Sequence, residues 1–158
     1  RSNNKIKTVQ KELAKLYQTE TAYFNAPVDK VWDLFKAFEF DKLFDNRIKS
    51  VKFISGRPSE VGSIFQITYL DDTTRSNRVT AINTRDHELS WELVKTTDST
   101  DFDTFTTNMK FTDVSYNKGT FVEWTNEYTG NPNPSSLEQA RQNKIDSFNA
   151  VERILRQH

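Results

Sequence analysis

The last part of the chain, SSLEQARQNKIDSFNAVERILR (residues 135–156), decides the fold. Its apolar side chains recur at helical spacing over about six turns, at Leu137, Ala140, Ile145, Phe148, Val151, Ile154 and Leu155. Ser135 or Ser136 is placed to cap the start, and Glu138 or Gln139 can complete a capping box. The pattern predicts one long amphipathic helix that needs an apolar surface to pack against.

The chain before this helix changes to a period of two, which predicts strands. We expect them at 48–55, 63–70, 75–83, 88–95, 103–112 and 120–128. A further strand is predicted at 16–24, followed by a short helix from Val28 and a second short helical piece at 40–44. The connections between strands are short, so strands adjacent in sequence are expected to pair in antiparallel fashion.

An amphipathic helix and a sheet with one apolar face can bury both surfaces if the sheet curls around the helix. We therefore predict an α+β fold, in which a curved, seven-stranded antiparallel sheet surrounds a long C-terminal helix. Two short helices follow the first strand. Residues 1–158 are expected to form a single domain, with residues 1–10 as a poorly ordered or helical extension.

The composition excludes several classes of protein. The 158 residues contain no cysteine, which excludes disulfides, thiolate metal sites and a cysteine nucleophile. The 22 lysines and arginines balance the 22 aspartates and glutamates, so nucleic-acid binding is not expected. No apolar run approaches the roughly 20 residues that span a bilayer, so stable membrane insertion is not expected. The absence of a usable Asn-x-Ser/Thr acceptor favours a cytoplasmic location.

Few side chains are suited to metal binding or covalent catalysis. His87 lies in a turn signal and His158 is the last residue, so neither is expected to bind a metal. Asp98, Asp101 and Asp103 are close together, but the segment has no EF-hand pattern and is interpreted as a solvated hairpin loop. No metal and no cofactor are predicted.

Four local strings carry a resemblance to a known family. They are NAPVDKVW (25–32) at the first strand-to-helix join, GSI (62–64), LSWEL (89–93) and VEW (122–124). Together with the order of elements, these strings resemble the SRPBCC superfamily. Its members share the helix-grip fold and include START domains, polyketide cyclases, birch-pollen-allergen-like proteins and abscisic-acid receptors. The resemblance covers residues 17–155 and is closest to the polyketide cyclase/dehydrase-like (lachrymatory-factor-synthase-like) branch.

Two departures from that branch affect the expected chemistry. The resemblance implies an inward-pointing Arg and Glu at the positions of Phe65 and Asn77, and often a tyrosine at Phe105. Their absence makes the expected cavity less suited to acid–base chemistry.

A strongly curved sheet around one helix encloses more volume than the helix fills, so an apolar cavity is expected between them. Because successive side chains of a strand point to opposite faces of the sheet, every second residue is predicted to face the cavity. The same alternation predicts that Ala81 and Asp103 face the cavity. Polar members such as Asn77, Thr107 and Asn126 would need a ligand or ordered water as partner. The predicted ligand-binding residues are Phe65, Ile67, Tyr69, Asn77, Trp91, Phe105, Thr107, Met109, Trp124, Asn126, Tyr128, Ile145, Phe148 and Val151.

The sequence supports three hypotheses about function. The preferred one is a binding or carrier protein for a small hydrophobic molecule, such as a lipid, sterol, isoprenoid or aromatic metabolite. The alternative is a cyclase-, dehydratase- or isomerase-type enzyme without metal, in which Asp103 or Tyr128 moves a proton in the same cavity. A third is a protein-interaction domain with a filled core. The oligomeric state is left open between monomer and dimer.

Overall fold

The computed structural model describes residues 15–157. Its elements, in chain order, are β1 (Leu16–Phe24), α2 (Val28–Lys36), α3 (Phe40–Leu43), β2 (Ile48–Ser55), β3 (Ile64–Tyr69), β4 (Thr74–Asn83), β5 (Glu88–Thr96), β6 (Phe102–Val114), β7 (Gly119–Gly130) and α4 (Pro134–Arg156). One seven-stranded antiparallel sheet has the order β1-β7-β6-β5-β4-β3-β2. The predicted α+β fold is confirmed. The predictions for residues 1–10 and for His158 fall outside the described residues.

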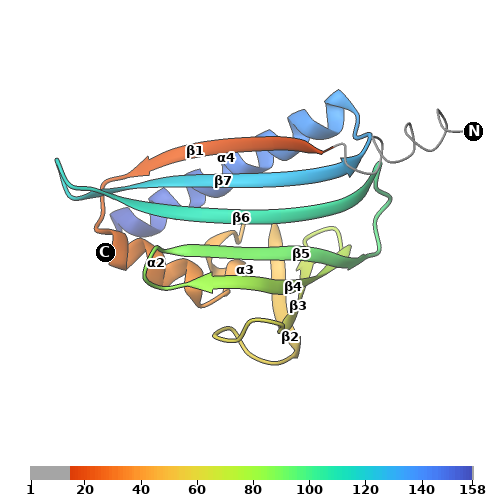
Figure 1. The fold of residues 1–158 in the computed structure, drawn as a ribbon, viewed down its shortest axis with the longest axis horizontal. Coiled ribbons are helices and arrows are strands. Elements are labelled where there is room, and N and C mark those ends of the chain that lie inside the picture. Colours follow the sequence, from red (N-terminus) through yellow and green to blue (C-terminus); the bar gives the residue numbers. More distant parts are fainter. Residues whose placement is uncertain (1–14, 158) are drawn as a thin grey trace, which may run out of the picture.

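Helix α4 lies along one face of the sheet (Figure 1). In this view β1, β7 and β6 lie along a common axis with alternating direction, whereas β2 and β3 turn sharply away from that axis, so the sheet curls. Helices α2 and α3 lie near one end of the curl. No helix within residues 15–157 is long and apolar enough to cross a membrane.

Interruptions of strand register contribute to the curvature. The pairing shifts at two points between β2 and β3, at two between β4 and β5, and at one between β6 and β7. Each bulge bends its strand and strengthens the local twist. In β4, the shift between Val79 and Ala81 leaves Ala81 exposed, contrary to strict alternation. Ile82 packs against the core instead.

The two short helices build an aromatic core at one end of the sheet. Helix α2 buries Val31, Trp32 and Phe35. The link to α3 passes through Phe38, whose φ of 56° lies in the left-handed region that bulky residues rarely adopt. Phe38 is 1% exposed, and its ring centroid lies 5.3 Å from that of Phe65. Burial of this large ring offsets a backbone strain of about 1–3 kcal/mol.

Helix α4 begins differently from the predicted capping box. It starts at Pro134, with Asn133 as its N-cap residue and no side-chain hydrogen bond from that residue. Proline suits the first turn because its missing N–H would have no helical partner there. The Asp101 carboxylate, from the β5–β6 loop, accepts hydrogen bonds from the Asn133 backbone N–H and the Ser136 hydroxyl, both at 2.8 Å. Capping by Ser135 or Ser136 was a wrong prediction, because a neighbouring loop anchors the helix start.

The C-terminal half of α4 packs directly into the core. Phe148 is 8% exposed, and its ring lies 6.1 Å from Phe24 and 5.7 Å from Trp124, edge-on in both cases. Val151, one turn later, is fully buried. The helix therefore depends on the sheet for its stability, as its apolar stripe predicts.

Phe148→Ala is expected to lower the free energy of unfolding by about 3–5 kcal/mol, because it leaves a void between Phe24 and Trp124. Asn149→Ala, at the next and exposed position, is the control and should change it by less than about 0.5 kcal/mol. Denaturant unfolding followed by circular dichroism measures both. A small loss for both variants would contradict the packing of α4 against Phe24 and Trp124.

Candidate ligand-binding cavity

A cavity of about 760 Å³ lies between the N-terminal half of α4 and the inner face of the sheet. Its walls come from strands β3 to β7 and the first residue of β2, from α3 and the segment after it, and from residues 135–144 of α4. Exposed residues of the β3–β4 loop, the β5–β6 loop and the first turn of α4 also line it. The cavity therefore reaches the surface beside these three segments.

Most of the residues predicted to bind a ligand line this cavity. They are Ile67, Tyr69, Asn77, Trp91, Phe105, Thr107, Met109, Trp124, Asn126 and Tyr128. All of them project from strands β3 to β7, where alternation selects the face that the cavity occupies. Ligand binding by these residues stays a prediction.

Four predicted residues do not line the cavity. Phe65 is fully buried in the aromatic core against Phe38. Phe148 and Val151 lie in the half of α4 that packs into the core, and Ile145 is also absent from the cavity wall. The structure therefore places Phe65, Phe148 and Val151 in the core rather than in the cavity wall, because the apolar face of this half of α4 is used for packing.

Asp103, the first catalytic candidate, does not face the cavity. The pairing of β6 with β7 shifts register between Phe102 and Thr104, so Asp103 is the extra residue of a bulge. Its side chain is exposed, and Phe102 takes the place in the cavity wall. The expectation that Asp103 lies beside a ligand was therefore wrong.

Tyr128, the second catalytic candidate, lines the cavity and donates a hydrogen bond to Gln18 Oε1 at 3.2 Å. Burial raises the pKa of its hydroxyl to about 12, so Tyr128 is a protonated donor near neutral pH. Gln18 was not predicted from the sequence. It lies on β1 and donates through Nε2 to the Leu137 carbonyl of α4 at 2.7 Å. Gln18 thus ties the sheet to the polar half of the helix.

Buried polar side chains of the cavity wall have protein partners. Asn126 donates to the Thr107 hydroxyl at 3.0 Å, and Asn77 makes a long hydrogen bond of 3.5 Å to the Arg75 carbonyl. Among the residues described, the only buried side-chain polar atom without a partner is Nε1 of Trp32, which is not in the cavity wall. Asn126 and Thr107 therefore partner each other in part, and the expectation that a ligand or water completes their hydrogen bonding stays a prediction.

Two cations that were not predicted as site residues also line the cavity. Lys144 of α4 is only 4% exposed, and its ammonium donates to Gln18 Oε1 at 3.3 Å and to the Ala140 carbonyl at 3.5 Å. Arg47, just before β2, donates to the Ser147 hydroxyl at 3.0 Å. Within the described part of the chain, neither cation has a carboxylate within 4.0 Å.

Burial perturbs both of these cations. Desolvation lowers the pKa of Lys144 to about 8, while the carboxylate of Glu20 opposes this shift and the charge of Arg47 adds to it. Desolvation also lowers the pKa of Arg47. A signal for Lys144 was present in the sequence, since it stands four residues from both Ala140 and Phe148, inside the apolar stripe. Arg47 belongs to no periodic pattern.

A third cation, Arg75 on β4, is paired. Its guanidinium donates to both carboxylate oxygens of Asp98, at 3.3 and 3.0 Å, and the Thr96 hydroxyl donates to the same carboxylate. The guanidinium also lies 5.8 Å from the ring centroids of Phe102 and Phe105. Partial burial of Asp98 opposes ionisation, but the hydrogen bonds from Arg75 and Thr96 prevail and lower its pKa.

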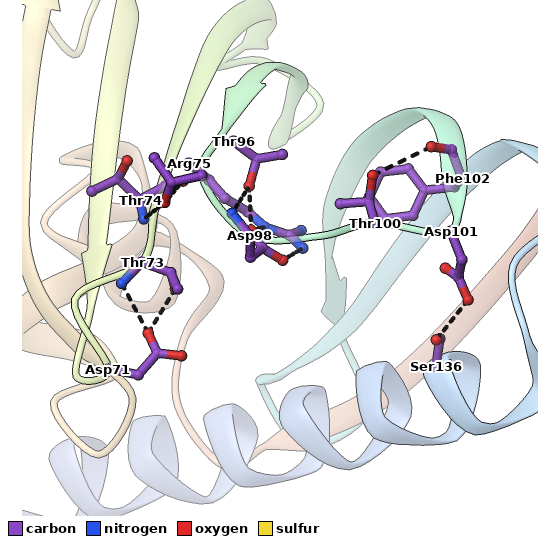
Figure 2. A network of polar contacts seen from close by, with 11 residues as sticks. Asp71, Thr73, Thr74, Arg75, Thr96, Asp98, Thr100, Asp101, Phe102 and Ser136 are labelled. Atoms are coloured by element: carbon purple, nitrogen blue, oxygen red, sulfur yellow. Dashed lines mark hydrogen bonds and ion pairs between the residues drawn. The ribbon is translucent and has the colours of Figure 1, made fainter.

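The acidic cluster is therefore more structured than a solvated loop. Figure 2 shows the Arg75–Asp98 pair and the Asp101–Ser136 contact along the rim that faces α4. Of the three aspartates, Asp103 alone is exposed. Within residues 15–157, no group of three or more His, Asp or Glu side chains is arranged to hold a metal ion.

A curved antiparallel sheet that encloses a cavity against a C-terminal helix defines the helix-grip class of proteins. Within this class, the chain belongs to the family described as polyketide cyclase / dehydrase and lipid transport, whose model matches residues 18–150. The resemblance seen in the sequence is thereby confirmed. No curated protein matches the chain.

Solved structures show the same fold. Major latex-like protein 151 from Panax ginseng superposes with a TM-score of 0.75 at 15% identity, covering 87% of this chain and 95% of that one. Ara h 8.0201 gives 0.76 at 15% identity, with coverage of 92% and 100%. A putative uncharacterized protein from Bacillus thuringiensis gives 0.75 at 14% identity, with coverage of 88% and 98%. At such low identity these likenesses show the fold alone.

Lys144→Met removes the buried charge, so we expect its effect on stability to depend on pH. Below pH 8 the wild type keeps Lys144 charged in the folded and unfolded states and bears the full burial penalty. Between pH 8 and 10.5 the folded protein releases this proton while the unfolded chain keeps it. The wild type should therefore gain stability relative to the variant, by on the order of 3 kcal/mol.

Urea unfolding of the wild type and of Lys144→Met between pH 7 and 10.5 measures this difference in the free energy of unfolding. Groups that titrate in both proteins contribute equally, so their effects cancel in the difference. Lys110→Met replaces an exposed lysine of β6 and should show no comparable slope. A difference between wild type and Lys144→Met that stays constant across this range would contradict a buried, desolvated Lys144.

Proposed function

We propose that this protein binds a small, largely apolar molecule in the cavity between α4 and the sheet. The observation that carries the proposal is the cavity itself, because about 760 Å³ falls within the roughly 300–1,000 Å³ typical of small-molecule sites. Buried Trp91 and Met109 supply apolar wall, with Phe44 and Trp124 stacked beside them at a centroid distance of 5.8 Å. The lipid transport named in the family's description supports the same function.

The geometry supports binding better than proton transfer by the two predicted catalytic residues. Asp103 lies outside the cavity, and Tyr128 keeps its proton near neutral pH. The carboxylate of Asp98 lines the cavity but is bound by Arg75. A general base needs a free basic atom within hydrogen-bond reach of the substrate, which none of these three side chains supplies.

Binding should change the fluorescence of Trp91 and Trp124, since both line the cavity. We expect this when the protein is titrated with a panel that contains a long-chain alcohol, a sterol and a flavonoid. A ligand present at a hundredfold excess over its Kd should raise the free energy of unfolding by about 2.7 kcal/mol, and the Tm by roughly 5–10 °C.

Ala140→Phe provides the matched variant, because Ala140 faces the cavity from α4 and a phenyl ring there would occupy ligand space. It should weaken binding about 10-fold or more. Ala81→Phe adds the same ring on the exposed face of β4 and should leave affinity unchanged. A panel that changes neither fluorescence nor Tm would contradict the proposal and favour a filled core.

Asp103→Asn separates the carrier from the enzyme hypothesis in which this aspartate is the base. Since the side chain is exposed outside the cavity, ligand affinity should stay within about twofold of wild type between pH 5 and 8. Following the fate of a bound compound with both proteins tests this. Turnover by the wild type that falls about 10²–10⁴-fold in Asp103→Asn, with binding intact, would support the enzyme instead.

A further inference from the structure

The cavity wall also indicates the chemical class of its ligand. We infer that the cavity takes an amphipathic carboxylate, whose apolar body lies against the aromatic wall and whose carboxylate lies between Lys144 and Arg47. This inference rests on the proposed function and names the kind of molecule that it would bind.

The first observation is an incomplete electrostatic balance around a buried charge. Lys144 is only 4% exposed. Its ammonium nevertheless donates to neutral oxygens, Gln18 Oε1 at 3.3 Å and the Ala140 carbonyl at 3.5 Å. Hydrogen bonds to ammonium groups are usually shorter, about 2.7–2.9 Å when the acceptor is an anion. A buried charge is normally paired, because removing it from water is costly. The ammonium therefore has the capacity for an anionic partner.

The second observation is that Arg47 approaches the same stretch of α4. Its guanidinium donates to the Ser147 hydroxyl, which lies one turn after Lys144. The positive charge of Arg47 also lowers the pKa of Lys144. Two like charges in one wall repel each other unless an anion lies between them. A guanidinium has five N–H donors and is well suited to a carboxylate. Arg47 and Lys144 can thus share one anion.

Uncharged donors lie around the same region. The Tyr128 hydroxyl shares the Gln18 Oε1 acceptor with Lys144. The Arg47 guanidinium lies 5.9 Å from the ring centroid of Tyr69, whose pKa is raised by burial. Both tyrosines therefore carry their protons near neutral pH. The Tyr69 hydroxyl is suited to donate to an anionic oxygen, and Tyr128 can do so by exchanging its hydrogen bond to Gln18.

The carboxylates near the cavity are already engaged. Asp98 pairs with Arg75, and Asp101 binds the start of α4, as Figure 2 shows. Figure 2 also shows Asp71 of the rim accepting from Thr73, and Glu20 of β1 lies 3.7 Å from Arg141. Asp146 attracts Arg47 and Glu20 attracts Lys144 from a greater distance, but no carboxylate of the described residues lies within 4.0 Å of either inner cation. A ligand carboxylate could therefore pair directly with both.

A matched pair of probes tests the inference: dodecanoic acid and dodecan-1-ol have the same chain and differ in charge. Tryptophan fluorescence at pH 7 measures both affinities. We expect the wild type to bind the acid about 10- to 100-fold more tightly, because hydrogen bonds between charged groups are worth more than neutral ones. Lys144→Met and Arg47→Met should each reduce this preference by about 10-fold, whereas Lys110→Met should preserve it.

The pH dependence gives a second measurement that needs no variant. The acid's affinity should fall as the pH rises above about 8, where Lys144 loses its charge, while the alcohol's affinity should not. The other groups that face Lys144 are Glu20 from β1, Arg47 from the segment before β2, and Tyr128 from β7. Of these, Arg47 stays charged, and Tyr128 titrates only near pH 12.

The outcomes separate the two proposals. If the wild type binds the acid and the alcohol equally, the inferred carboxylate site is wrong while the binding function stands. The same holds if the preference survives in both Lys144→Met and Arg47→Met. If the wild type binds neither probe and no ligand of the panel, the binding function is wrong and the inference fails with it. If a variant does not fold, the wild-type acid-to-alcohol ratio and its pH dependence still decide.

Discussion

The packing of Phe148 between Phe24 and Trp124 is the contact on which the rest of the architecture depends. It holds the C-terminal half of α4 in the curl of the sheet, whereas the N-terminal half carries Gln139, Asn143 and Lys144 where a core helix would carry apolar residues. Those side chains cannot fill an apolar space, so the helix and sheet stand apart there. The cavity is the direct consequence of a helix whose apolar stripe is complete at only one end.

Two polar contacts keep the open half of α4 in place. Gln18 links β1 to the Leu137 carbonyl, and Asp101 links the β5–β6 loop to the first turn through Ser136. Both contacts lie away from the aromatic core and use partners that are distant in sequence. They hold the wall of a cavity that hydrophobic packing alone would close or leave undefined.

The charges of the cavity differ between rim and interior. At the rim, Arg75 and Asp98 neutralise each other, which limits the cost of partial burial. In the interior, the acceptors of Lys144 and Arg47 among residues 15–157 are neutral. Burial of these two charges costs stability, and such local costs are common at functional sites.

The sequence by itself determined the order of the elements, the antiparallel pairing of neighbouring strands and the face that each strand turns inward, because periods of 2 and 3.6 residues are local properties of the backbone. It placed Ile67, Trp91, Thr107 and Tyr128 on the cavity side. Only the tertiary structure decided where that periodicity breaks. The bulge at Asp103 removes a catalytic candidate from the cavity, since a single extra residue reverses the face of a side chain. Tertiary structure also decided which half of α4 is core and which is cavity wall, because that depends on the depth of a sheet whose curvature is set by pairing between distant segments.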